Sequence, residues 1–143
     1  MAYTGFVHLN TSGYAETTEL VGSAPTLLSR TTGINLKTVA TTDLYTVPTG
    51  KTLVITQVVI RLSAADTIAV VATGGIGTNV TQDDIIPAIA LTGLTGLTKI
   101  FMMANNNLIS TVAAGDAVVK LGIDIGATAT TATGIVDLFG YLI

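Results

Sequence analysis

The chain of 143 residues lacks cysteine and tryptophan, and its single histidine is His8. Without cysteine it can form neither a disulfide framework nor a thiolate metal site. A catalytic histidine needs a nucleophile or an orienting carboxylate within hydrogen-bond reach, whereas the neighbours of His8 are the apolar residues Val7 and Leu9. We therefore interpret this histidine as part of an edge strand or an interface.

Charge is equally scarce: 10% of the residues are charged, against about 25% in an ordinary soluble domain. The six basic residues are scattered and form no stripe of the kind that binds a phosphate backbone, so we expect no nucleic-acid partner. No apolar run reaches the roughly 18 residues of a membrane span, and the N-terminus lacks the pattern of a signal peptide. We expect a protein that is made in a cytoplasm and has no membrane partner.

Apolar residues make up 49% of the chain, before its 15 glycines are added. With so few charges, this leaves more apolar surface than one domain of this size can bury, and large apolar patches usually mark interfaces. We expect a homo-oligomer, and specifically a trimer. The alternative is a monomer whose surface is coated with threonine, which occurs 26 times.

From about residue 36 onward the sequence consists of short β-prone runs separated by Gly, Pro, Asn and Asp turns. Eight or so strands, spaced by about 8–12 residues, predict an all-β sandwich or barrel. A single helical turn is possible at residues 81–85, where Thr81 could act as the cap.

The strongest predicted strand spans residues 52–62. At a period of two, one face carries Leu53, Ile55, Val59 and Arg61, and the other carries Val54, Thr56, Val58, Ile60 and Leu62. Both faces are largely apolar, which is typical of a strand whose outer surface is covered as well as its inner one.

Residues 1–35 differ in composition from the sandwich domain predicted for residues 36–143. They are rich in turn formers and contain both glutamates of the chain, Glu16 and Glu19, which favours an extended N-terminal arm. Four of its residues could bind a partner by adding a strand to a neighbour's exposed edge: Tyr3, Phe6, Val7 and Leu9. The alternative is that they pair within their own sandwich.

Catalytic chemistry has no candidate constellation. Asp83 and Asp84 are the only adjacent carboxylates, and without an Asp-x-Asp-x-Asp-Gly loop we interpret them as solvated or as the cap of a helical turn, and not as a calcium site. Residues 74–77 imitate part of a phosphate loop, but no lysine follows them. No serine lies in a Gly-x-Ser-x-Gly elbow. We expect a protein that is not an enzyme, with no catalytic residues, no bound metal and no cofactor.

Three stretches carry a family resemblance: residues 47–61, 114–121 and 127–143. They resemble strand regions of the small jelly-roll virion proteins of tailed bacteriophages, and within that group the capsid decoration (cement) proteins. The resemblance implies a jelly-roll-like antiparallel β-sandwich that is located in the virion and has no catalytic residues. It also implies binding to the major capsid protein or another virion protein on the outside of the head, where contacts between capsomers are stabilised, often by trimers.

Two other roles fit the same pattern. One is a tail, fibre or head-fibre component of the virion. The other is a carbohydrate- or receptor-binding module, although aromatic residues amount to only 5% of the chain.

Overall fold

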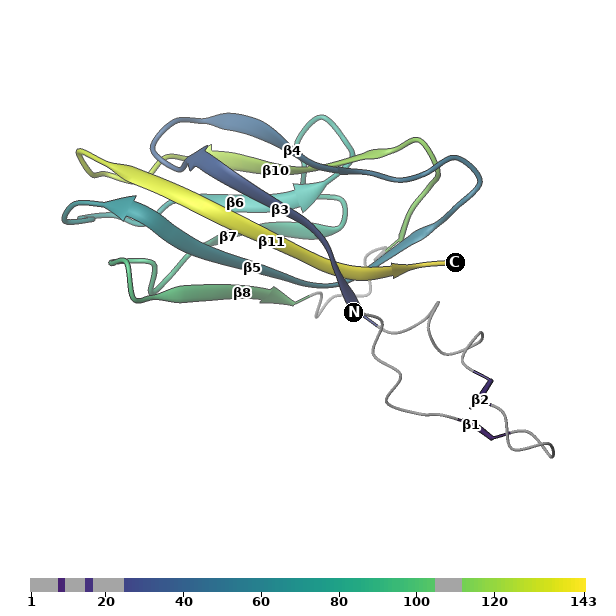
Figure 1. The fold of residues 1–143 in the computed structure, drawn as a ribbon. Coiled ribbons are helices and arrows are strands. Elements are labelled where there is room, and N and C mark those ends of the chain that lie inside the picture. The colour runs from purple at the N-terminus through teal and green to yellow at the C-terminus, as the bar shows by residue number, and fades with distance from the viewer. Residues whose placement is uncertain (1–7, 10–14, 17–24, 105–111) are drawn as a thin grey trace.

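The computed structural model describes residues 8–9, 15–16, 25–104 and 112–143, and every regular element in them is a β-strand (Figure 1). Residues 81–85, where the sequence allowed a single helical turn, form a loop of bends between two strands. In the part of the chain that the structure describes, no helix is long and apolar enough to cross a membrane. The predicted all-β class is confirmed.

The strands form two facing antiparallel sheets and one small separate sheet. The five-stranded sheet has the order β3 (Thr26–Asn35), β11 (Ala132–Leu142), β5 (Leu53–Ala65) and β8 (Ile100–Ala104), with β9 (Val112–Ala113) also paired with β5. The four-stranded sheet has the order β4 (Ala40–Thr46), β10 (Val118–Ile125), β6 (Thr73–Gly77) and β7 (Ile86–Ala90). The separate sheet pairs β1 (His8–Leu9) with β2 (Ala15–Glu16).

The pairing of the eight long strands is nested. The outermost strands along the chain, β3 and β11, pair with each other; inside them β4 pairs with β10, β5 with β8, and β6 with β7, all antiparallel. This is the pattern of an antiparallel ribbon folded over on itself, which defines a jelly roll of two sheets. The predicted jelly-roll-like sandwich is therefore confirmed.

The core lies between the two sheets and consists of alternate side chains from both. In β5 the fully buried side chains include Leu53, Ile55, Val58 and Ile60, which is not the alternation predicted from the sequence. Ile55 pairs with Gly140 and Gln57 with Phe139, so Thr56 has no partner on β11. This β-bulge moves Leu53 and Ile55 to the inner face that Val58 and Ile60 occupy.

The sandwich begins earlier in the chain than predicted. Strand β3 pairs with β11 from Thr26 to Asn35, so residues 26–35, which we assigned to the N-terminal segment, are an edge strand of the five-stranded sheet. The strand was missed because its side chains are mostly polar or exposed, as is usual for an edge strand. Tyr3, Phe6 and Val7 lie outside the described residues, and Leu9 lies in β1.

Candidate interaction surface

The outer faces of the two sheets differ in chemistry, and this difference identifies the candidate surface. On the four-stranded sheet, the outward positions of β4 and β10 carry Thr41, Asp43, Lys120 and Asp124, while the intervening residues of β10 are buried. Lys120 Nζ lies 3.7 Å from Asp43 Oδ1. The strand positions at the centre of this face are therefore polar, whereas exposed apolar side chains occur around them at Val39, Val80, Ile89 and Ile125.

Part of the polar face is covered by the loop between β6 and β7, residues 78–85. A Cβ atom at Gly77 would lie 2.6 Å from the backbone nitrogen of Asp83, and one at Gly122 would lie 2.9 Å from Cβ of Gln82. Because neither position has a side chain, the loop can lie directly on β6 and β10. Gln82 is buried there with a positive φ of 52°.

The two adjacent aspartates hold this loop together. Oδ1 and Oδ2 of Asp84 accept hydrogen bonds from the backbone N–H (2.6 Å) and the hydroxyl (2.8 Å) of Thr78. Asp83 Oδ1 accepts from Asn79 Nδ2 at 2.8 Å. Burial alone would raise the pKa of Asp84, but the hydrogen bonds from Asn79 and Thr78 outweigh it and lower the pKa. For Asp83, hydrogen bonds from Thr81 and Asn79 lower the pKa.

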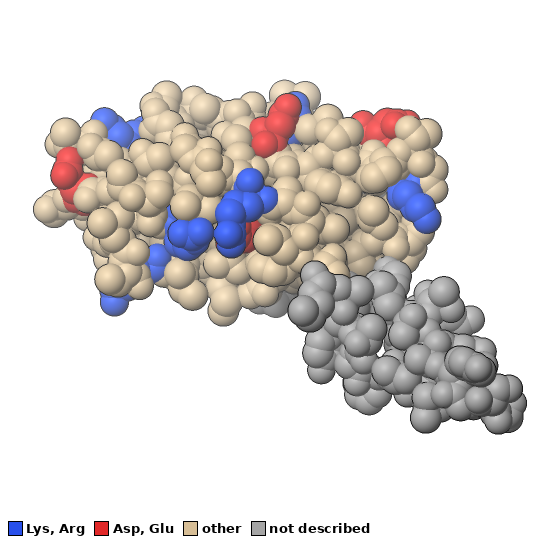
Figure 2. Space-filling model, viewed as in Figure 1, with Lys and Arg blue, Asp and Glu red and all other residues tan. Residues whose placement is uncertain are grey.

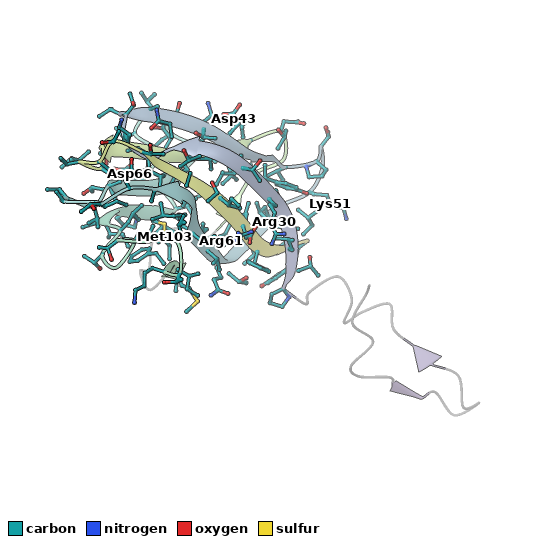
Figure 3. The ribbon with its side chains drawn as sticks, turned by 60° about the vertical axis from the view of Figure 1, so that its left-hand side comes forward. Arg30, Asp43, Lys51, Arg61, Asp66 and Met103 are labelled. Atoms are coloured by element: carbon teal, nitrogen blue, oxygen red, sulfur yellow. The ribbon has the colours of Figure 1, made fainter. Side chains whose placement is uncertain are left out.

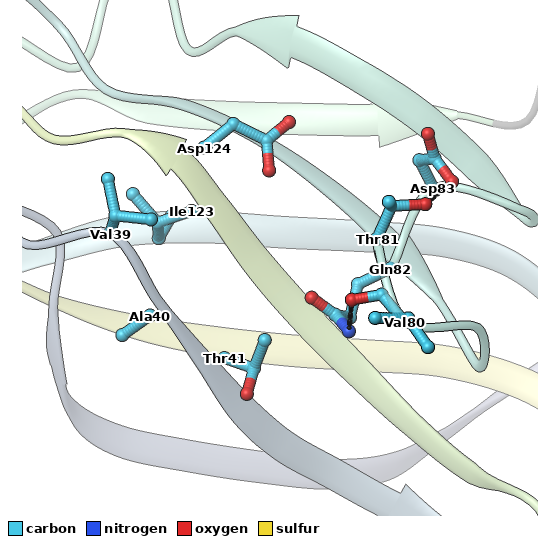
Figure 4. A pocket seen from close by; sticks show the side chains of 9 residues that line it. All are labelled: Val39, Ala40, Thr41, Val80, Thr81, Gln82, Asp83, Ile123 and Asp124. Atoms are coloured by element: carbon cyan, nitrogen blue, oxygen red, sulfur yellow. Dashed lines mark hydrogen bonds between the residues drawn. The ribbon is translucent and has the colours of Figure 1, made fainter.

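A groove of about 430 Å³ lies between this loop and the adjoining parts of β4 and β10 (Figure 4). Its lining combines methyl groups with two carboxylates, and includes Val39, Val80, Ile123, Asp83 and Asp124. Within residues 8–9, 15–16, 25–104 and 112–143, no group of three His, Asp or Glu side chains is placed to hold a metal ion.

The outer face of the five-stranded sheet carries several large apolar side chains, among which Thr32, Gln57 and Arg61 also lie. Its cross-strand neighbours include Phe139 beside Leu27, and Val59 beside Met102. We call this surface the apolar face and define it by residues Leu27, Val54, Val59, Ile100, Met102, Ile135, Phe139 and Tyr141. Leu27, Met102 and Ile100 are 46%, 58% and 60% exposed.

A charged group interrupts the apolar face near its middle. Nε and Nη2 of Arg30 donate to Oδ1 and Oδ2 of Asp137 at 2.6 and 2.9 Å, so the pair is bidentate. Figures 1 and 2 view the molecule with this sheet in front, and most of the surface over it is neither acidic nor basic. Figure 3 shows Arg61 close to Arg30.

This arrangement keeps Asp137 ionised and leaves one arginine in excess. Hydrogen bonds from Arg30 lower the pKa of Asp137 against the opposing effect of burial, and the charges of Arg30 and Arg61 lower it further. The same hydrogen bond raises the pKa of Arg30. Arg61 makes no ion pair with any residue that the structure describes. The apolar face therefore carries a net positive charge.

The arginine–aspartate pair could not be found from the sequence, because the two residues are 107 positions apart and Arg30 stood in the predicted arm. One signal was present: Asp137 interrupts an otherwise apolar run from Gly134 to Ile143. Residues 52–62 were predicted to have a covered outer surface, and the side chains that β5 places on its outer face include Val54, Gln57, Val59 and Arg61. Of the predicted partner-binding residues, none has a side chain in the described structure.

Comparison with known proteins finds a likeness of fold. No protein-family model and no curated protein sequence matches the chain. A chain of the cyanophage Pam1 capsid asymmetric unit matches with a TM-score of 0.55 and 17% identity, over 98% of this chain and 96% of that one. A chain of the acid-stable capsid of Helicobacter pylori bacteriophage KHP30 matches with a TM-score of 0.50 and 11% identity, over 85% and 96% of the two chains.

Proposed function

We propose that this chain is a non-enzymatic structural protein of a bacteriophage virion, and that it serves as a capsid decoration (cement) protein. In this role it binds the outside of the head, contacts the major capsid protein or another virion protein, and stabilises the junctions between capsomers. The observation that carries the proposal is the jelly-roll fold, which 98% and 85% of this chain share with chains from two phage capsids.

The two faces of the sandwich support a binding role at a surface. A decoration protein must bury one side against its neighbours and expose the other to solvent. The apolar face provides the first side, because exposed large apolar side chains gathered on one surface are a common mark of an interface. The polar outer face of the four-stranded sheet, with its hydrogen-bonded loop, provides the second.

Self-association belongs to the same proposal. We expect a homotrimer, because the apolar face on a single chain would expose large side chains such as Ile100 and Met102 to water, at a cost of about 25 cal/mol for each Å². A trimer would also provide three equivalent contacts for one junction between capsomers.

The proposal is tested by adding the purified protein to phage heads that lack it. We expect saturable binding, a fixed number of copies per head and greater resistance of the loaded heads to heat. Binding to isolated tails, or to glycans of the host surface, in place of heads would overturn the decoration role in favour of a tail component or a receptor-binding module.

A further inference from the structure

We propose that the open edge of β8 is an assembly site, and that it accepts the β1–β2 hairpin of a neighbouring copy of this chain as added strands. The proposal concerns how copies of the chain join one another, and it holds or fails independently of what the oligomer binds.

The edges of the two large sheets in the described structure are formed by β3, β8 and β9 in one sheet and by β4 and β7 in the other, and β3, β4 and β7 carry features that discourage pairing. Edge strands are commonly protected by charge or by proline. Pro87 lies in β7, Asp43 in β4 and Arg30 in β3. Strand β8 has the sequence Ile-Phe-Met-Met-Ala and contains neither charge nor proline.

The unprotected edge also lies beside exposed apolar side chains. In the described structure β8 pairs only with β5, so one row of its backbone N–H and C=O groups faces away from the sheet. Ile100 and Met102 are 60% and 58% exposed. An added strand would satisfy the backbone groups and cover both side chains at once.

Within the described residues, the β1 and β2 strands lack a further strand to pair with, as the edge of β8 does. Each of these strands has two residues, and in the described structure they pair only with each other. An isolated two-stranded hairpin is marginally stable in water, and a third strand is needed for independent stability. Of the large-sheet edges in the described residues, only those of β8 and β9 lack a feature that blocks such an addition, and β9 has two residues against the five of β8.

The charges of the two elements are opposite in sign. Glu16 lies in β2, Glu19 follows it, and no lysine or arginine occurs before Arg30. At the receiving site, Lys99 precedes β8, and Arg61 is the cross-strand neighbour of Ile100. Attraction between an acidic segment and a basic edge favours this pairing over a contact between two β8 edges.

A neighbouring copy is the occupant because within one chain the hairpin and β8 belong to separate sheets. Each copy then gives one hairpin and receives one. Such a head-to-tail contact generates a closed ring when the rotation between copies allows closure, which agrees with the trimer proposed above.

The test uses the full-length chain with single substitutions at exposed positions. Met102→Lys places a charge at the proposed contact. Val80→Lys is the matched control, since Val80 is 94% exposed on the loop of the other sheet. By light scattering we expect the unmodified chain and Val80→Lys to give the mass of three chains, about 44 kDa from 14.6 kDa each, and Met102→Lys to give a monomer with unchanged circular dichroism. An unchanged oligomer in Met102→Lys would overturn the proposal.

A cross-linking experiment identifies the occupant. The chain has no cysteine, so Leu9→Cys with Met102→Cys introduces the only two thiols, and Leu9→Cys with Val80→Cys is the control. A short bismaleimide should join the first pair between chains and leave the control pair unjoined. Cross-links confined to single chains, or equal cross-linking in the control, would contradict exchange between copies.

The charge complementarity is tested by reversal. Glu16→Lys combined with Glu19→Lys should weaken association at low salt by about tenfold or more, and adding Lys99→Glu should restore part of it. If the double variant associates as strongly as the unmodified chain, the proposed orientation of the hairpin along β8 is wrong.

Discussion

Asp137 is a buried charge on the outer face of the five-stranded sheet, and it depends on a partner from the neighbouring strand. The carboxylate lies on the outer side of β11 with 6% of the residue exposed. Arg30 holds it by two hydrogen bonds from the neighbouring strand. Because a buried carboxylate is costly unless it is paired and hydrogen-bonded, β3 and β11 depend on each other at this point.

Replacing this carboxylate should therefore destabilise the sandwich. In Asp137→Asn the charged, bidentate interaction is lost and the buried amide keeps at most part of the hydrogen bonding. We expect a loss of about 1 to 2 kcal/mol in the free energy of unfolding, measured by urea denaturation. Asp124→Asn, at an exposed position on the other sheet, is the control and should change stability little. Equal stability of the two variants would contradict the role given to Asp137.

The same pair predicts a dependence on pH. The folded state lowers the pKa of Asp137, so its contribution to stability is fully present above the unfolded pKa of about 3.9 and is lost as the pH falls through the folded value. The stability difference between the unmodified chain and Asp137→Asn should be constant from pH 7 to pH 5 and should shrink in more acidic solution. A difference that grows below pH 4 would have the wrong sign.

Asp83 and Asp84 act as hydrogen-bond acceptors within their own loop, so metal removal should have no effect. We expect the melting temperature to be the same with EDTA and with calcium. A fall of several degrees in EDTA that calcium reverses, and that Asp84→Ala abolishes, would show that the pair binds the ion after all.

At the scale of elements, the loop of residues 78–85 depends on glycine in the strand beneath it. A methyl group at Gly77 would collide with Asp84 Oδ1 and lie 2.6 Å from backbone atoms of Gln82 and Asp83. Gly77→Ala should lower the free energy of unfolding by about 1 to 3 kcal/mol. Gly96→Ala is the control, because no atom lies within 4 Å of its added carbon, and it should change stability by about 0.5 kcal/mol or less.

The strands were largely predictable from local pattern, and the exceptions depend on pairing with strands that are distant in the chain. Residues 52–62 and 117–125 were recognised because β-branched and apolar residues recur in them. The bulge at Thr56 was not, because an extra residue is defined by the partner strand, and Ile55 and Gln57 meet their partners on a strand some 80 residues away in the chain. Strand β3 was missed because most of its side chains are polar, so that only its pairing with β11 distinguishes it from a loop.

The sequence predicted that the chain has an apolar interface, but it did not predict which sheet face carries that interface. The apolar excess of the composition, and the two apolar sides of residues 52–62, indicated a covered outer surface. Which face would be apolar depends on four strands being brought side by side, and the nested order β3, β11, β5 and β8 is a long-range property of the fold. The arginine–aspartate pair at its centre depends on the same order.

At the scale of the whole molecule, the two sides of the sandwich expose different kinds of side chains. The side with β3, β11, β5 and β8 presents large apolar side chains around a charged pair and an open edge. The side with β4, β10, β6 and β7 presents threonine, charge and a hydrogen-bonded loop, together with exposed Val80 and Ile89. Such a two-sided body suits a protein that lies on a larger surface. This asymmetry, together with the shared fold, is the basis of the proposed place on a phage head.

The number of copies of the chain in each purified virion tests that proposal most directly. Quantitative mass spectrometry, with the major capsid protein as internal standard, gives this number without disturbing the particle. A decoration protein that occupies the junctions between capsomers should be present in hundreds of copies, at a fixed ratio to the major capsid protein. A handful of copies would place the chain in the tail or its fibres, and its absence from virions would contradict a structural role in the particle altogether.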